Sequence, residues 1–405
     1  MKRNETKNET MTSEMSHRLR CVIMRGGTSK AVFLKEADLP RDASERRRVI
    51  LRIFGSPDSR QIDGLGGADP LTSKVAIIGP PRLNNPRAVH TDLTYTFGQV
   101  EIGTPEIDYV SLCGNISSAV GAFAIYEGML EPIEPITIVR AYNTNLDRVL
   151  RIEVPVCGTR PLEAGDYVVA GVPGSGARIM VDLADTAGGA TGSLLPTGNA
   201  IDCLEVEGVG PVDVSLVDIG NAHVFVRARD VGIAGTETAA EIDAQSDLRE
   251  RLERIRAAAA HRIGMLLDIT RSRQDTPATP LLAMISAPAD YRNDIAGTDV
   301  RSDQCDVVSR LMFMQQMHKT YAGTSTVCTG VASRIPGTIV HEATRPVSHA
   351  GDTLRIGHPA GVIETEARVE RAGGGYEVRR ATLGRTARRI MEGYAFVPDT
   401  GGTRG

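Results

Sequence analysis

Short apolar runs separated by turn residues dominate the first part of the chain. The runs are rich in Val, Ile, Tyr, Phe and Thr, and Gly, Pro, Asn and Asp stand between them, which is the pattern of β-strands. It predicts strands in RCVIMRGG, AVFLK, SKVAIIG, DLTYTFGQV, PITIVRAYN and VLRIEVPV. The first part of the chain is therefore expected to be mainly sheet.

Two segments of this first part have a helical pattern instead. RDASERRRVILRIFG offers Asp42 or Ser44 as a helix cap and ends at Gly55. A second helix is predicted from about Gly114 to Tyr126, inside the stretch SLCGNISSAVGAFAIYEG. Its residues are small and it has no charged face, so we expect sheet to enclose it closely.

The same order of elements recurs in the second part of the chain. Strands are predicted in CLEVEGV, VDVSLVDIG and HVFVRA, and helices in ETAAEIDAQSDLRERLERIRAAAAHRIGMLL and SDQCDVVSRLMFMQQMHKTY. A second small-residue helix, GTSTVCTGVASRI, precedes strands in TLRIGH, GVIETEARVE and YEVRRATLGRTARRIMEGYAFV. The repeated order predicts two similar halves with a cleft between them, and the start of each small-residue helix facing that cleft.

The boundary between the halves is expected near residue 190, where ADTAGGATGSLLPTGN is rich in Gly, Ala and Thr. We predict a disordered extension over residues 1–19 and a first half over residues 20–190. Strands at about 376–400 would complete this first half, and the second half would span residues 191–375.

Composition narrows the class of protein. The chain has 405 residues, 41% apolar and 24% charged, and a formal net charge of −4. This balance is typical of a soluble globular protein and predicts no nucleic-acid or membrane partner. The polar N-terminus is no secretory signal. Six widely spaced cysteines without a C-x-x-C pair indicate reduced thiols, a cytoplasmic location and no zinc site.

Cys113 stands directly before the first small-residue helix. The first N–H groups of a helix are unpaired and carry partial positive charge, which favours a thiolate there and can hold a substrate carboxylate. A buried packing cysteine is the alternative. Cys328 lies about one turn inside the second such helix and is interpreted as packing.

Lys74 follows a glycine-rich loop, DGLGGADPLTS, at the start of an apolar strand. Partial desolvation there would lower the pKa of its amine enough for it to act as a base. The alternative is a lysine that ends the strand with its amine in water. His318 is interpreted as a core or capping residue at the end of a Met-rich helix. MRGGTSKAVFL and GVPGSGAR lack the order of known nucleotide loops.

A multiply anionic substrate also favours a guanidinium, which binds a carboxylate through two hydrogen bonds. Arg25, Arg292 and Arg310 are candidates for this role. A surface or structural role is the alternative for each, because the chain is rich in arginine.

Six stretches taken together carry a family resemblance: MRGGTSKAVFL, GGADPLTSKVAIIG, CGNISSAVGAFA, LLPTGN, AGTSTVCTGVASRIPGT and RIGHPAGVIE. In this order they resemble the 2-methylaconitate cis–trans isomerase family, which includes 4-oxalomesaconate tautomerase, 3-methylitaconate Δ-isomerase and aconitate Δ-isomerase. The resemblance extends from about residue 20 to residue 400. It implies the α/β (α+β) diaminopimelate-epimerase-like fold, in which two pseudo-symmetric halves each curl a mostly antiparallel sheet around a central helix.

The resemblance also implies the site, in the cleft between the halves. Lys74 matches the family's catalytic lysine and Cys113 its active-site cysteine. The residues that match substrate-binding positions, or adjoin them, are Ser29, Gly66, Gly67, Ser73, Gly114, Asn115, Ile116, Thr324 and Ser325. The implied activity is a cofactor-independent isomerase that moves a proton and a double bond, by an allylic 1,3-shift or a cis–trans isomerisation, in an unsaturated di- or tricarboxylate such as an aconitate, methylaconitate, methylitaconate or oxalomesaconate, without metal, nicotinamide or PLP.

Two alternatives remain open. One is an amino-acid racemase or epimerase of the same fold, but such enzymes use a cysteine at each helix start, and GTS stands at the second start here. The other is a non-catalytic protein that binds a tricarboxylate. In each case the expected partner is a small carboxylate, with a homodimer as the default assembly.

Overall fold

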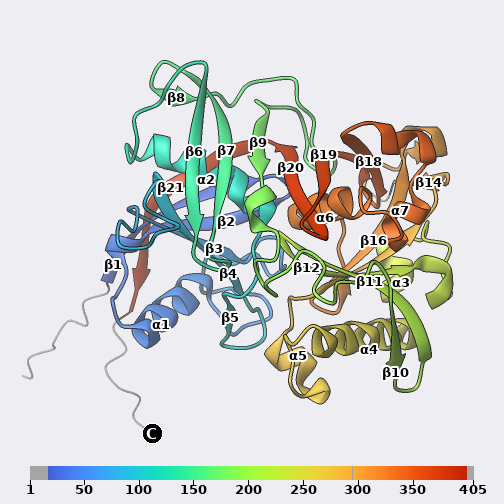
Figure 1. Ribbon diagram of the computed structural model, residues 1–405. Coiled ribbons are helices and arrows are strands. Elements are labelled where there is room, and N and C mark those ends of the chain that lie inside the picture. Colours follow the sequence, from blue (N-terminus) through green and yellow to red (C-terminus); the bar gives the residue numbers. More distant parts are fainter. Residues whose placement is uncertain (1–16, 294, 399–405) are drawn as a thin grey trace, which may run out of the picture.

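The strands form one continuous sheet that curls around two helices. The computed structural model describes residues 17–293 and 295–398 (Figure 1). Within these residues, 19 strands belong to the large sheet and two short ones pair separately. We call the elements from β1 to η2 the first half and those from β10 to β19 the second half.

The first half consists mainly of strands around one helix. Its strands are β1 (His17–Gly26), β2 (Ser29–Lys35), β3 (Lys74–Gly79), β4 (Leu93–Val100), β5 (Ile107–Asp108), β6 (Ile136–Asn143), β7 (Arg148–Cys157), β8 (Arg160–Pro161) and β9 (Ile179–Asp182). Its helices are α1 (Ala43–Phe54) and α2 (Gly114–Tyr126), with short 3-10 turns η1 (Glu36–Asp38) and η2 (Ala184–Thr186).

The second half has the same plan. Its strands are β10 (Asp202–Val206), β11 (Gly210–Ile219), β12 (Asn221–Arg227), β13 (Leu281–Ser286), β14 (Tyr291–Arg292), β15 (Asp299–Val300), β16 (Val307–Phe313), β17 (Gln316–Met317), β18 (Thr353–His358) and β19 (Gly361–Ala372). Its helical elements are η3 (Ala228–Val231), α3 (Ala239–Asp243), α4 (Ser246–Arg262), η4 (Ile269–Arg271), α5 (Ser272–Asp275), η5 (Ser302–Gln304), α6 (Gly323–Ala332), α7 (Ile339–Ala343) and η6 (Pro346–Ala350).

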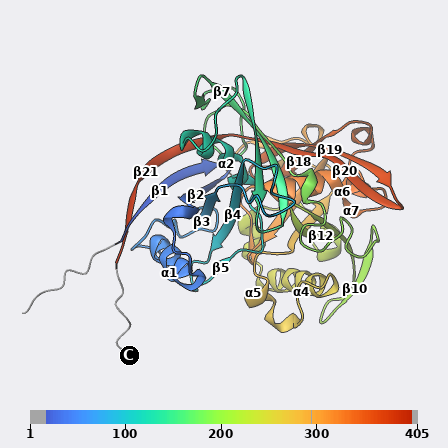
Figure 2. The same cartoon turned by 60° about the vertical axis from the view of Figure 1, so that its left-hand side comes forward.

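Two C-terminal strands, β20 (Gly375–Arg385) and β21 (Ala387–Val397), join the halves. β20 pairs with β19 along one edge and with β9 along the other. β21 returns to the first half and pairs with β1 over its whole length, so the first and last described strands lie side by side (Figure 2). The proposed division near residue 190 falls between η2 and β10. Residues 17–19 of the expected extension belong to β1, and residues 1–16 lie outside the described residues.

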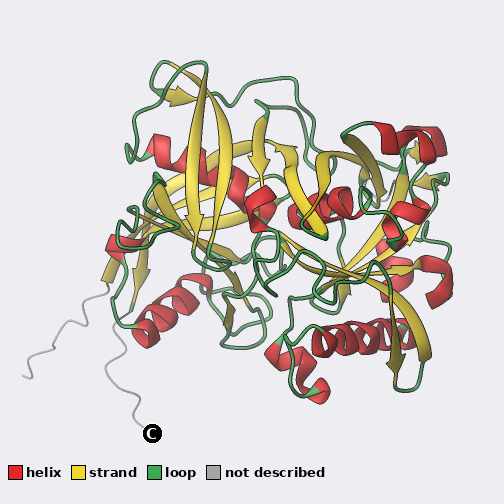
Figure 3. Cartoon of the chain, viewed as in Figure 1, coloured by secondary structure: helices red, strands yellow, loops and turns green. Residues whose placement is uncertain are grey.

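Each half places one small-residue helix inside the sheet and one amphipathic helix outside it (Figure 3). The sheet residues Met24, Phe33 and Ala76 pack toward α2, while neighbouring residues Val32, Leu34 and Val75 pack with α1 on the opposite face. This is why β3, KVAIIG, is buried throughout. In the second half, α6 and α4 occupy the corresponding inner and outer positions.

The two central helices begin where the sequence predicted, and α2 matches its predicted range, while α6 ends at Ala332, three residues before the predicted end. All residues of α2 except Tyr126 are buried, and so is every residue of α6. Small side chains permit this enclosure: a Cβ on Gly121 would lie 2.7 Å from a methyl group of Val154. α1 is also confirmed, since the Asp42 side chain accepts from the N–H of Glu45 and Gly55 ends the helix at a φ of 71°.

One predicted helix is wrong. The segment SDQCDVVSRLMFMQQMHKTY forms η5, β16 and β17. β16 lies between β13 and β18 with nearly every residue buried, so neither of its faces is polar. A strand covered on both faces has no alternation by which the sequence could distinguish it from a buried helix. The long helix predicted before it is interrupted at Ala244 and Gln245, where α3 gives way to α4.

None of the helices among residues 17–293 and 295–398 is long and apolar enough to cross a membrane.

Candidate active site

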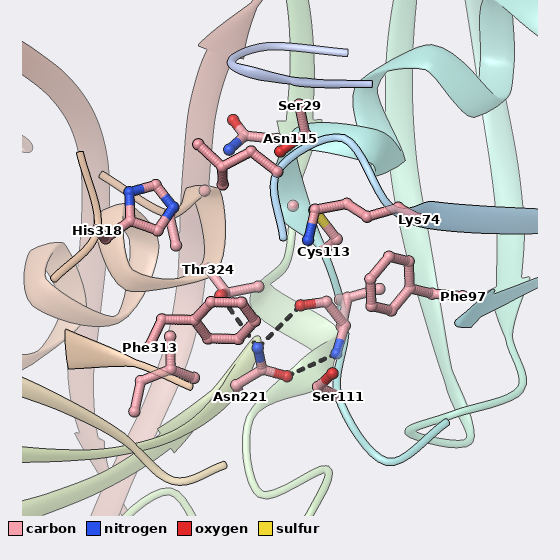
Figure 4. Close-up of a pocket in the computed structure, with 16 residues that line it drawn as sticks. Ser29, Lys74, Phe97, Ser111, Cys113, Asn115, Asn221, Phe313, His318 and Thr324 are labelled. Atoms are coloured by element: carbon pink, nitrogen blue, oxygen red, sulfur yellow. Dashed lines mark hydrogen bonds between the residues drawn. The ribbon is translucent and has the colours of Figure 1, made fainter. Parts of the chain in front are cut away.

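A cavity lies where the two halves meet (Figure 4). Its walls come from both halves and include the starts of both central helices. The lining residues are Ser29, Leu71, Lys74, Phe97, Ser111, Leu112, Cys113, Gly114, Asn115, Asn221, Leu281, Phe313, His318, Ala322, Gly323 and Thr324. The sequence placed six of these in the site: Ser29, Lys74, Cys113, Gly114, Asn115 and Thr324.

The two helix starts touch one another at this cavity. A Cβ on Gly114 would lie 2.9 Å from the backbone nitrogen of Thr324, and a Cβ on Gly323 would lie 2.8 Å from that of Asn115. Only glycine permits such an approach of two backbones. No side chain caps either helix, so the positive ends of α2 and α6 converge on one volume. This arrangement suits a substrate with more than one carboxylate.

Lys74 places its amine in the cavity wall. It is the first residue of β3 and is only 3% exposed. Its Nζ donates to Oε1 of Gln99 and lies 5.5 Å from the ring centroid of Phe97 and 5.4 Å from that of Phe313. Burial lowers the pKa of Lys74 from its usual value of 10.5, against the smaller opposing effect of nearby negative charges. This is the environment of an amine that can serve as a base.

Cys113 occupies the position directly before α2, where its side chain makes no capping hydrogen bond, and it is partly exposed to the cavity. Its sulfur and the Lys74 amine point into the same region (Figure 4). Cys328, by contrast, is fully buried in α6, and burial raises the pKa of its thiol well above 9.0. The two cysteines therefore differ as the sequence predicted, since one faces the cavity and the other packs in the core.

Asn221 fixes the floor of the cavity and was missed by the sequence analysis. Its Oδ1 accepts from the N–H of Leu112 at 2.7 Å, and its Nδ2 donates to the carbonyl of Leu112 at 2.8 Å. The same Nδ2 donates to Oγ1 of Thr324 at 3.1 Å (Figure 4). One side chain thus ties the loop that leads into α2 to the start of α6. Asn221 follows a turn glycine, Gly220, and nothing in the neighbouring sequence distinguishes it from an ordinary asparagine in a turn.

His318 faces the cavity from the second half, after β17 rather than at the end of a helix. Burial is the main cause that lowers its pKa to about 4, and the positive charge of Lys74 adds to this effect. The ring is therefore neutral near pH 7. Its Nδ1 accepts from the N–H of Thr320 at 3.1 Å, which leaves Nε2 as the nitrogen that carries the proton.

A hydrogen-bonded chain connects the two helix starts through Asn115. Its Nδ2 donates to Oγ1 of Thr28 at 3.1 Å, and Oγ1 of Thr320 donates to the same Thr28 oxygen at 3.1 Å. The Asn115 Oδ1 accepts from Nε of Arg385 at 2.7 Å, and another nitrogen of Arg385 contacts Thr326 of α6. Burial lowers the pKa of Arg385 to about 10. This buried cation behind both helices was also missed.

The other predicted site residues do not line the cavity. Gly66 and Gly67 belong to the loop before β3, where added Cβ atoms would strike Gln61 and Thr72. Ser73 donates to Gln61, Ile116 is a core residue, and Ser325 contacts Nε2 of His223. A substrate contact for these residues stays a prediction.

The arginine candidates also lie outside the cavity wall. Arg292 is exposed on β14 and forms an ion pair with Asp299. Arg310 is buried in β16, where it donates to the carbonyl of Glu237 and stands over the ring of Tyr291. Arg25 donates to two backbone carbonyls near the turn between β1 and β2. Their positions give no support to the predicted binding of a substrate carboxylate in this cavity.

Two curled halves, with their central helix starts meeting at a cavity that holds a buried lysine and a cysteine, define a protein of the diaminopimelate-epimerase-like class. The model of the PrpF protein family matches residues 16–398. The chain belongs to the PrpF family, and the family and fold inferred from the sequence are confirmed.

Similar proteins agree with this assignment. The chain is 51% identical over 380 residues to a protein from Eubacterium barkeri named 3-methylitaconate isomerase, covering 94% of this chain and 97% of that protein. A crystal structure of methylitaconate-delta-isomerase matches with a TM-score of 0.79 and 49% identity, over 96% of this chain and 98% of the other. A hydroxyproline epimerase from Agrobacterium vitis matches with a TM-score of 0.54 and 11% identity, over 95% and 94% of the two chains, and shares the fold alone.

Proposed function

We propose that this protein is an isomerase that moves a proton, and with it a carbon–carbon double bond, within an unsaturated dicarboxylate that carries a small alkyl group. The observation that carries the proposal is the buried Lys74 beside Cys113, in a cavity where two uncapped helix starts converge. The cavity offers a base, an acidic group and two places for carboxylates. No further cofactor is required for the chemistry.

The reaction begins with substrate binding at the helix starts. One carboxylate accepts from the N–H groups of Gly114 and Asn115, and the other from those of Gly323 and Thr324. This holds the carbon skeleton against Lys74 and Cys113. The carbon next to the double bond then carries an acidic C–H, because its anion is conjugated with a carboxylate.

The proton moves in two steps. The neutral amine of Lys74 removes the allylic proton, and the electron pair of the C–H bond becomes part of a dienolate whose charge faces the helix starts. Cys113 supplies a proton to the far allylic carbon, the double bond shifts, and Lys74 returns a proton to the thiolate. The product is an isomer of the substrate, with no net oxidation or loss of atoms.

The substrate class follows from the cavity walls. Apart from the helix starts, the walls are largely apolar, with Leu71, Phe97, Leu281 and Phe313 around the lysine. Among the described residues that line the cavity, Lys74 is the one with a basic amine, and none carries a guanidinium. Such a site suits two carboxylates and a methyl-sized group better than three carboxylates. The name of the relative from Eubacterium barkeri, 3-methylitaconate isomerase, supports the same choice.

The test is a proton-NMR assay in D₂O with purified protein and four acids: 3-methylitaconate, 2-methyl-cis-aconitate, trans-aconitate and 4-oxalomesaconate. We expect fastest conversion of 3-methylitaconate, with deuterium entering at the allylic positions. Binding of an acid without deuterium exchange would support a non-catalytic binding protein instead. Exchange at the α-carbon of proline or another amino acid would support a racemase, which the threonine at the second helix start argues against.

The cellular location and assembly are proposed from the sequence. All six cysteines, including the exposed Cys157 and Cys203, are free, which suits the cytoplasm. A homodimer is the proposed assembly, and light scattering of the purified protein tests it.

A further inference from the structure

Lys74 is held by one side chain that does not itself line the cavity. In the sheet register, Lys74 of β3 stands opposite Gln99 of β4, and Gln99 stands opposite Asp108 of β5. The three residues therefore form a row across the same face of the sheet. Gln99 is fully buried and accepts the hydrogen bond from the Lys74 amine.

The direction of the Gln99 amide is fixed by its other partners. Its Nε2 lies 3.1 Å from the carbonyl oxygen of Pro70 and 3.1 Å from that of Ser73. Carbonyl oxygens can only accept, so the NH₂ group must face them and Oε1 must face Lys74. The amide is therefore an acceptor that cannot rotate away without leaving a buried polar group unpaired.

A neutral acceptor at this place has a defined effect on the amine. It takes one N–H of Lys74 and so turns the remaining positions of the nitrogen, including the lone pair of the neutral form, toward the cavity. A carboxylate in the same place would instead favour the ammonium form by direct charge attraction. Gln99 holds the lysine without adding that charge.

Several other titratable groups also act on Lys74 through their charge. Cys113, Asp69, Asp108 and Glu101 act on it from α2, the preceding loop, β5 and the end of β4, and His318 acts from the second half. Burial raises the pKa of Glu101 to about 7 and also raises that of Asp108. Glu101 thus brings less negative charge to the lysine near pH 7 than an ordinary carboxylate would.

We propose that Gln99 is a positioning residue for the isomerase: its fixed amide aims the Lys74 amine into the cavity without adding a negative charge that would favour the ammonium form. The proposal rests on the function proposed above, in which Lys74 is the base. Gln99 thus affects the rate of the reaction although it does not touch the substrate. A merely structural glutamine would affect folding but not the charge of Lys74.

The test compares Gln99→Glu with Gln61→Glu. Gln61 is an equally buried glutamine, hydrogen-bonded to Ser73 next in sequence to Lys74, but it makes no contact with the lysine amine. The first readout is the rate at which acetic anhydride acylates Lys74 between pH 6 and 11, followed by mass spectrometry with the exposed Lys319 as internal standard. This readout does not depend on turnover.

We expect Gln99→Glu to raise the midpoint of Lys74 acylation by about one pH unit or more, so that labelling at neutral pH slows about tenfold. The pH at which kcat/KM falls on the acid side of its pH profile should increase by the same amount. Gln61→Glu should shift the midpoint clearly less. Wild-type labelling in Gln99→Glu, or an equal shift in both variants, overturns the proposal.

Gln99→Met provides a second test if the charged variant does not fold. Methionine keeps the shape but removes the acceptor, so the amine is no longer aimed. We expect kcat to fall at least about tenfold without a rise in the acylation midpoint. Normal kcat in a folded Gln99→Met overturns the proposal. If no acid of the panel is converted by the wild type, the proposed function fails, while the acylation midpoints still decide the role of Gln99.

Discussion

Lys74 shows how far a single residue depends on its surroundings. The sequence places it at the start of an apolar strand, which leaves both a solvated and a buried amine open. In the folded protein the amine is buried, because the Phe97 and Phe313 rings come from different halves and enclose it between them. The same lysine on an open sheet would be protonated at neutral pH and could not act as a base.

Replacing Lys74 by methionine tests its role. The substitution keeps the length and apolar stem of the side chain, so the fold should persist. We expect kcat/KM to fall by roughly 10²–10⁴, the usual contribution of one positioned general base. Steady-state kinetics, with circular dichroism as the control for folding, measure this. Activity within about threefold of the wild type contradicts the assignment.

Cys113 is tested by comparing serine with alanine. If the thiol supplies a proton, serine is a poor substitute because its hydroxyl is far less acidic. We therefore expect Cys113→Ser and Cys113→Ala to lose kcat to a similar extent, by about 10²-fold, with little change in KM. Near-normal kcat in the serine variant alone would show that the group only shapes the cavity. Cys328→Ala serves as a control for loss of a cysteine outside the cavity.

The site residues that sequence reasoning recovered are those with a local signal. A lysine after a glycine-rich loop, or a cysteine before a small-residue helix, can be found because chemistry and position coincide in one short segment. No such local signal marks the other site residues, which are Asn221, His318, Gln99 and Arg385. Their roles arise from strand register or from contact between the halves, which one sequence does not reveal. Arg292 and Arg310 were chosen for charge alone, and the fold places both away from the cavity.

At the scale of elements, the central helices were predictable because their composition is unusual. Ten or more consecutive small and apolar residues without a charged face indicate enclosure wherever they lie. β16 was mistaken for a helix because burial on both faces removes the periodicity that separates the two structures. The joining role of β20 was equally hidden, since it depends on which distant strands flank it.

Because the two helix starts are in contact, we expect that Gly323 cannot be replaced by a residue with even one additional methyl group. Gly323→Ala would place its Cβ 2.8 Å from backbone atoms of α2, so the two helices must separate. We expect a loss of about 1–3 kcal/mol in the free energy of unfolding and an increase in KM, because the anion-binding groups move apart. Urea denaturation and kinetics measure the two effects.

The matched control is Gly351→Ala. Among the described residues, apart from its own chain neighbours, none places a heavy atom within 4 Å of the corresponding Cβ, and the φ of Gly351 is −113°, which alanine adopts readily. Its effect should stay within about 0.5 kcal/mol. Equal effects of the two substitutions would refute the close contact of the helix starts.

At the scale of the whole molecule, polar contacts between the halves surround the cavity. Nζ of Lys319 lies 3.0 Å from Oδ2 of Asp69, and the Asn221 side chain donates to the carbonyl of Leu112. The Arg385 side chain donates to Asn115 at the start of α2. The halves are thus joined by the same groups that shape the site. The sequence predicted two halves with a cleft, and the comparisons confirm that fold, but these bridging contacts follow only from the assembled molecule.

Buried histidines predict how stability changes with pH. Burial lowers the pKa of His223 and His318 to about 4 and that of His358 well below 6.5. Between pH 6.5 and about 4 the unfolded chain therefore binds protons that the folded protein excludes, and stability falls as the pH falls. Each histidine contributes a slope of about 1.4 kcal/mol per pH unit in this window.

Glu101 acts in the opposite direction. Its pKa of about 7 in the folded protein exceeds the usual 4.5, so the folded state gains a proton first and is stabilised as the pH falls through this range. Three histidines outweigh one glutamate, and the net expectation is a decrease in the urea midpoint from pH 7 to pH 5. Glu101→Gln should make the decrease steeper, and His90→Asn, at an exposed histidine, should leave it unchanged. A midpoint independent of pH contradicts the prediction.

The pairing of β1 with β21 has a consequence for biosynthesis. A chain leaves the ribosome from its N-terminus, so β1 emerges first and its partner emerges last. The sheet of the first half therefore gains β21 as a partner of β1 only after β10 to β19 have been made, and this edge of β1 has no strand partner in the meantime. We expect the first half to complete its sheet late in synthesis, with this edge of β1 open to pairing with other chains until β21 arrives.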